Sequence, residues 1–199
     1  PGLQPETAKT TELVWLHLFA NGYVSTTAFD TQVSNAIVET VTSQLKRSWG
    51  NSQQSVAGLE LEWQNNWSEH WQSRVAFTRI VNPVGYIHTE SSTLLSGSLS
   101  YQNSPWVCSL IANYQGAKRD PNEQEVPANI ITTEFTDYGG YSVYNAHISY
   151  QAHRQIELYL HIDNLFNKDY LLPANRPANF VGVPSVGRVI SAGLRWAFN

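Results

Sequence analysis

Carboxylate and imidazole side chains recur at two-residue spacing in two segments of this 199-residue chain. Glu60 and Glu62 form one pair, and Glu157, His161 and Asp163 form a second set. Residues two apart in a β-strand point to the same face, so each set would gather groups of the kind used in general acid–base catalysis. The same spacing arises whenever one face of a strand meets water, and we favour that simpler explanation. We therefore expect no catalytic residues and no enzyme activity.

Motifs for other chemistry are missing from the sequence. There is no phosphate-binding glycine-rich loop, no His-Glu-x-x-His motif and no Gly-x-Ser-x-Gly motif. The single cysteine, Cys108, permits neither an internal disulfide nor a cysteine-based zinc site. His88 could ligate haem or a metal complex, although a lone loop histidine is more often simply solvated. A net charge of −4 without a Lys/Arg cluster argues against nucleic acid. We predict no cofactor and no resident metal.

The elements that carry these residues show a period of two. In 155–164 the apolar side chains are Ile156, Leu158, Leu160 and Ile162, and the residues between them are polar or charged, with one tyrosine. Segments 141–151 and 188–198 repeat the pattern. Alternation of this kind predicts strands with one aliphatic face and one polar face.

Turn signals divide the chain into about nine strands. Four of the connections are short and four are long, and the two kinds alternate along the chain. The predicted strands are 11–20, 23–37, 55–63, 67–80, 93–102, 106–115, 141–151, 155–164 and 188–198. The short turns are 21–22, 64–66, 103–105 and 152–154, and the long loops are 38–54, 81–92, 116–140 and 165–187.

This organisation is typical of an antiparallel transmembrane β-barrel, with apolar side chains toward lipid and polar ones toward a wet lumen. Short turns on one side and long loops on the other are expected of an outer-membrane barrel. No apolar run approaches the roughly 20 residues of a membrane helix. Many of the 7 Trp and 10 Tyr lie near predicted strand ends, where interfacial belts would place them. We therefore expect an all-β protein with outer-membrane lipid as a partner.

The odd strand count bears on completeness. Bacterial single-chain barrels have an even number of strands, and backbone groups in lipid cannot remain unpaired at a sheet edge. We therefore expect residues 1–199 to be part of a larger barrel.

Two segments near the end and two nearer the beginning narrow the family. Asn164–Tyr170 reads Asn-Leu-Phe-Asn-Lys-Asp-Tyr, and Gly187-Arg188 leads into the last strand. Leu3–Leu13 and Val56–Glu60 carry a Leu-x-Pro-Glu pattern and a Gly-x-Glu pattern. Together these segments resemble elements of TonB-dependent outer-membrane receptors, over essentially the whole chain. The chain departs from that family at its end, since Phe198 is the penultimate residue whereas members usually finish on an aromatic residue.

The resemblance implies the last nine or so strands of a barrel of about 22 strands with a plugged lumen. It implies uptake of a scarce ligand, most commonly a ferric siderophore, with energy transmitted by TonB. It also implies recognition by the barrel-assembly machinery. The plug and the TonB-binding segment are N-terminal in the family, and we expect both to be absent from this chain.

Ligand capture in such a receptor would use the external loops and the outer lumen, because loops on a rigid scaffold usually carry recognition. Our candidates combine guanidinium, amide and aromatic groups in two predicted external loops. They are Arg119, Tyr138, Asn175, Arg176 and Phe180.

Other interpretations stay open at this level. A small passive pore would need closure within 199 residues. A barrel enzyme would need a Ser, a His and an acid gathered at one level. A soluble β-sandwich would pack its apolar faces together. A receptor of the same family could also take a ligand without iron, such as cobalamin, haem or a carbohydrate.

Overall fold

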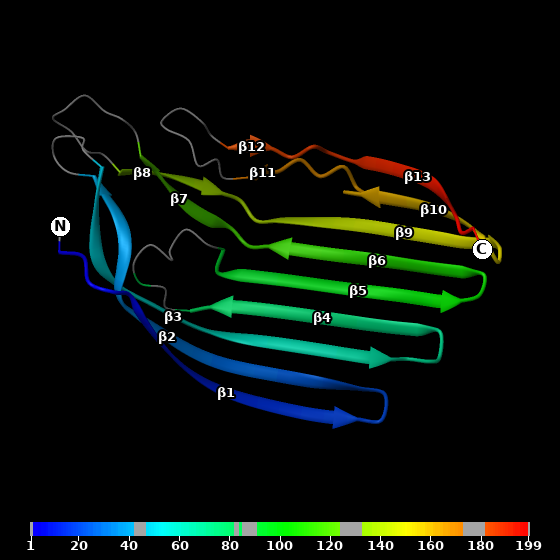
Figure 1. The fold of residues 1–199 in the computed structure, drawn as a ribbon, viewed down its shortest axis with the longest axis horizontal. Coiled ribbons are helices and arrows are strands. Elements are labelled where there is room, and N and C mark those ends of the chain that lie inside the picture. Colours follow the sequence, from blue (N-terminus) through cyan, green and yellow to red (C-terminus); the bar gives the residue numbers. More distant parts are fainter. Residues whose placement is uncertain are drawn as a thin grey trace.

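The computed structural model describes residues 2–41, 47–81, 84, 91–123, 133–172 and 182–198. Its main element is one antiparallel sheet of nine strands in the order β1-β2-β3-β4-β5-β6-β9-β10-β13 (Figure 1). Consecutive strands of this sheet are neighbours throughout, so the topology is a simple meander. The strands are β1 Thr7–Phe19, β2 Gly22–Val41, β3 Arg47–Asn66, β4 Trp71–Ile80, β5 Thr93–Asn103, β6 Trp106–Gln115, β9 Tyr141–His153, β10 Ile156–Asp163 and β13 Val189–Trp196.

The pairing register keeps the two predicted faces apart across the sheet. Leu158 on β10 lies opposite Tyr150 on β9 and Leu194 on β13. Its neighbour Glu157 lies opposite Gln151 and Arg195. We call the side that carries Leu158 the apolar face and the side that carries Glu157 the polar face.

The apolar face is not covered by a second layer. Leu158 is 44% exposed and Ile190 is 63% exposed, although both are aliphatic. Among the described residues, only Ala36 and Tyr138 are buried apolar side chains. A soluble sandwich would bury one face of each sheet against the other. The described part of the chain therefore argues against the sandwich.

Aromatic side chains gather on the apolar face near the short turns. The ring centroids of Trp71 and Tyr101 are 4.8 Å apart, and those of Trp106 and Tyr150 are 4.6 Å apart. Trp196 lies on the same face, opposite Ile156. Aromatic rings concentrate at membrane–water interfaces, where one part of the ring is apolar and the other is wet. This row is the girdle expected at one membrane boundary.

The connections are sorted by side, as predicted. In Figure 1 the turns β1–β2, β3–β4, β5–β6 and β9–β10 lie at one end of the sheet, which we call the short-turn end. The other connections lie at the opposite end. Two of them carry small sheets of their own, β7 Lys118–Glu123 with β8 Thr133–Tyr138 and β11 Leu171–Leu172 with β12 Val183–Pro184.

Several predicted loops contain more strand than the sequence indicated. Most of the predicted loop 38–54 belongs to β2 and β3, which pair from Val41 opposite Arg47 downward. Beyond the apolar band both faces of a strand meet water, so the alternation disappears while backbone pairing continues. The predicted turn 64–66 was misplaced, because β3 runs to Asn66 and the connection is 67–70. Among the described residues, no helix has the length and hydropathy needed to cross a membrane.

Candidate ligand-binding site

A row of side chains crosses four strands on the polar face, near the end opposite the short turns. Thr78 on β4 lies opposite Leu94 on β5, which lies opposite Gln115 on β6, which lies opposite Tyr141 on β9. Strict pairing register brings these residues, distant in sequence, into one line. Because Gln115 and Tyr141 are the last and first residues of their strands, the line ends beside the long connections.

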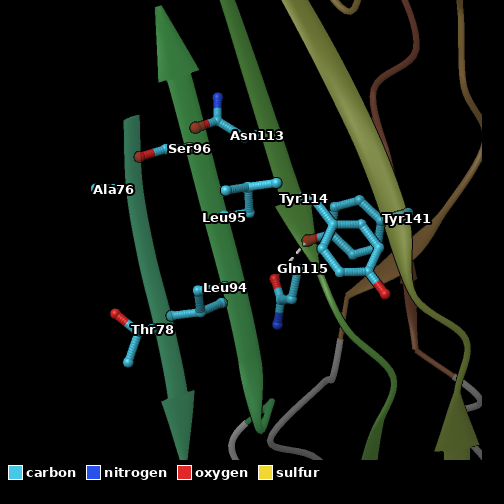
Figure 2. Close-up of a pocket in the computed structure, with 9 residues that line it drawn as sticks. All are labelled: Ala76, Thr78, Leu94, Leu95, Ser96, Asn113, Tyr114, Gln115 and Tyr141. Carbon is cyan, nitrogen blue, oxygen red and sulfur yellow. Dashed lines mark hydrogen bonds between the residues drawn. The ribbon is translucent and has the colours of Figure 1, made fainter. Parts of the chain in front are cut away.

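A depression of about 380 Å³ lies along this row. Figure 2 shows it between the β4–β5 pair and Tyr141. Its lining mixes hydroxyl, amide, aromatic and aliphatic groups, as ligand sites usually do. The lining residues are Ala76, Thr78, Leu94, Leu95, Ser96, Asn113, Tyr114, Gln115 and Tyr141.

Tyr141 is held in place by two contacts. Its hydroxyl donates a hydrogen bond of 2.8 Å to Gln115 Oε1, drawn dashed in Figure 2. Its ring stacks on Tyr170, with centroids 4.1 Å apart and planes 16° apart. Tyr170 is anchored in turn, since the Ser185 amide donates to its carbonyl at 2.9 Å. The two tyrosines form an aromatic wall on which a flat, conjugated ligand group can stack.

The Asn-Leu-Phe-Asn turn fixes the chain that carries Tyr170. Asn164 is 5% exposed, and its side chain accepts from the Lys168 amide and donates to the Lys168 carbonyl, each at 2.8 Å. Asn167 Oδ1 accepts from the Arg188 amide at 2.8 Å, which ties the turn to the segment entering β13. The residues that carry the family resemblance are therefore the ones that set the course of this connection.

Charged groups on the polar face are spread along it. Arg195 donates to Glu157 at 2.6 Å, and Arg74 donates twice to Gln64 Oε1. Glu60 and Glu62 are exposed and form no ion pair with any described residue. Where side chains are described, no three His, Cys, Asp or Glu groups are arranged to hold a metal ion. The acidic pair thus fits the hydrated wall that we favoured.

The structure places two of the five predicted ligand residues. Arg119 pairs through its backbone with Asp137 in the β7–β8 extension. Tyr138 ends β8 and is 6% exposed, and its Cε1 lies 2.9 Å from the position that a Cβ on Gly182 would take. Tyr138 therefore packs against the β11–β12 connection rather than facing solvent. The other three, Asn175, Arg176 and Phe180, lie outside the described residues, as does His88.

The alternation had already put Gln115, Tyr141 and Asn113 on polar or partly polar faces, but we did not select them as ligand residues. What was missing was the pairing register, which decides that Thr78, Leu94, Gln115 and Tyr141 lie side by side. The aromatic pair Tyr141–Tyr170 also depends on how the connection after β10 folds back.

The comparison with protein families decides the identity of the chain. The family model described as "TonB dependent receptor-like, beta-barrel" matches residues 1–165. The chain belongs to this family. Its members are outer-membrane transporters rather than enzymes, so the absence of a catalytic role for the polar-face carboxylates was predicted correctly. No curated protein sequence matches the chain.

Solved receptor structures share the fold. A point mutant of the ferric enterobactin receptor of Pseudomonas aeruginosa has a TM-score of 0.77 at 18% identity, over 99% of this chain and 32% of that one. The FrpB iron transporter of Neisseria meningitidis has a TM-score of 0.76 at 17% identity, over 98% and 32%. A copper transporter, OprC, has a TM-score of 0.72 at 16% identity, over 99% and 33%. The chain spans about a third of the length of these proteins, and its nine strands match part of their barrels.

Family membership orients the sheet. In outer-membrane barrels the short turns face the periplasm and the long connections face outward. The girdle of Trp71, Tyr101, Trp106 and Tyr150 then marks the periplasmic boundary, and the depression beside Tyr141 lies in the outer half of the wall.

Proposed function

We propose that this chain forms part of the barrel of a receptor that imports a ferric siderophore or another iron complex, with energy supplied through TonB. The observation that carries the proposal is the depression beside the Tyr141–Tyr170 wall on the polar face, at the end with the long connections. A ligand captured from outside would meet this surface before it met the rest of the wall. The iron receptors among the structural neighbours support iron as the cargo.

The external connections would complete the capture surface. We propose that Arg119, Asn175 and Arg176 contact acidic or carbonyl oxygens of the ligand, since guanidinium and amide groups donate hydrogen bonds to such acceptors. Phe180 would add an aromatic contact, and Tyr138 would support the β7–β8 extension from below. The plug, the TonB-binding segment and the remaining strands would come from a longer protein, because TonB engages receptors of this kind through their N-terminal region.

A cargo without iron is the second candidate within the family. The similarity to a copper transporter favours keeping it open. A passive pore is less compatible with the fold, because the nine described strands form an open sheet whose edge strands β1 and β13 are not paired with each other. Backbone groups at such edges must be paired before they can enter lipid.

The test is growth and uptake. Cells with and without the intact gene are grown on single defined iron sources, and uptake of each radiolabelled iron complex is measured. Our proposal expects one complex to support growth and uptake only with the gene, and only while TonB is present. Uptake that persists without TonB would indicate a pore. Uptake of cobalamin, haem or copper in place of any iron complex would assign the second candidate.

A further inference from the structure

Two histidines face each other across adjacent strands at mid-height on the polar face. His147 on β9 lies directly opposite His161 on β10. Their ring centroids are 6.0 Å apart, and the ring planes are inclined by 53°. Ser109 and Ser191 lie opposite them on the two outer neighbours, β6 and β13. The pair is thus flanked by small polar residues that leave the imidazoles room to move.

Asp163 sets the tautomer of one ring. Its Oδ1 lies 2.9 Å from His161 Nε2. An ionised carboxylate can only accept a hydrogen bond, so Nε2 carries the proton and Nδ1 of the neutral ring keeps its lone pair. His147 forms no hydrogen bond with any described residue, so its ring nitrogens are available as well. A carboxylate that orients a histidine in this way is the usual second partner of a metal-binding imidazole.

We propose that His147 and His161 together bind a divalent transition metal ion of the borderline-soft class, such as Zn²⁺ or Cu²⁺, with Asp163 as the positioning residue. Imidazole nitrogens suit these ions and hold them at about 2.0–2.1 Å. One nitrogen from each of two rings around such an ion puts the ring centroids about 5–6.5 Å apart. The observed separation of 6.0 Å falls within that range before any adjustment.

The site has two protein ligands and is open toward the lumen. Asp163 is committed to His161, and no third metal-binding side chain joins them in the part of the chain that the structure describes. The side chains of His161 and Asp163 are 39% and 48% exposed, so water or donor atoms of a passing ligand can fill the remaining positions. An open site of this kind allows a metal or metal complex to bind and leave again. It does not depend on the iron cargo proposed above.

The test uses the intact protein, purified without a histidine tag in detergent and stripped of metal. Titration with Zn²⁺ by calorimetry is expected to give one site that His147→Ala and His161→Ala each weaken at least tenfold. Asp163→Asn is expected to weaken it about 10- to 100-fold, because the orienting partner is lost. His153→Ala, at an exposed strand end, is the matched control and should bind as the native protein does.

A second measurement needs no folded variant. Pulsed electron paramagnetic resonance of the Cu²⁺-loaded native protein should show two coupled imidazole nitrogens, and one in either single variant that folds. Zn²⁺ binding that is unchanged in the His147→Ala, His161→Ala double variant would overturn the proposal. So would a Cu²⁺ spectrum without two imidazole nitrogens, or the absence of any Zn²⁺ or Cu²⁺ binding.

Discussion

Asn164 adopts a left-handed backbone conformation, with φ of 50°, and is nearly buried. Its side chain satisfies both the amide and the carbonyl of Lys168. Asn tolerates this backbone region better than most residues, and no apolar side chain can replace its two bonds. The short motif that suggested the family is thus explained by the turn that it builds.

We predict that Asn164→Ala destabilises the folded protein by about 1–3 kcal/mol, because the Lys168 backbone groups lose their partners. The measurement is the temperature at which the intact protein loses its SDS-resistant folded form. Asn103→Ala is the control, since Asn103 is exposed at a strand end and makes no side-chain hydrogen bond to the described residues. Equal melting of the two variants would contradict the role assigned to Asn164.

At the same scale, the Tyr141–Tyr170 stack predicts a graded effect on ligand affinity. Tyr141→Phe keeps the stack and loses only the bond to Gln115, so affinity should fall less than about tenfold. Tyr141→Ala removes the aromatic wall and should cost at least a further tenfold. Binding of the imported complex to whole cells is measured at equal surface expression. Similar affinities for both variants would remove Tyr141 from the site.

At the scale of the strand, two glycines distinguish packing from mere flexibility. A Cβ at Gly58 on β3 would lie 2.6 Å from the Phe29 ring and 2.6 Å from the Arg79 carbonyl oxygen. At Gly97 on β5 the nearest heavy atom would be 3.9 Å away. Both glycines lie within central strands, so they make a matched pair.

We predict that Gly58→Ala lowers the assembled fraction in the outer membrane, since overpacking costs about 1–3 kcal/mol. Gly97→Ala should assemble normally or slightly better, because alanine restricts the unfolded chain. The assembled fraction is the share of the protein that is SDS-resistant in isolated outer membranes. Equal loss in both variants would mean that glycine is needed there for its backbone rather than for space.

At the scale of the whole molecule, the sorting of connections predicts opposite exposure of the two ends. Ser104→Cys lies in a short turn, whereas Gly139→Cys lies among the outer connections, where an added Cβ meets no atom within 4 Å. In a Cys108→Ala background, a membrane-impermeant maleimide should label position 139 in intact cells. Position 104 should be labelled only after the outer membrane is opened. The reverse pattern would invert the topology.

Much of this architecture could be predicted from the residues alone. Alternation in 155–164 and the turn signals predicted the nine strands, their two faces and the side on which each connection lies. It failed for 38–54, because β2 and β3 continue where both faces are wet and alternation carries no information. It was silent on the β7–β8 and β11–β12 pairings, which depend on contacts between the connections themselves.

The candidate sites separate the two kinds of information most clearly. The sequence by itself determined that Glu60, Gln115, His147 and His161 lie on a polar face, because side chains alternate along every strand. Only the tertiary structure decided which of them are neighbours, because a shift of register moves each residue to different partners across the sheet. The register placed His147 opposite His161 and Gln115 opposite Tyr141, and the fold of the following connection brought Tyr170 onto Tyr141.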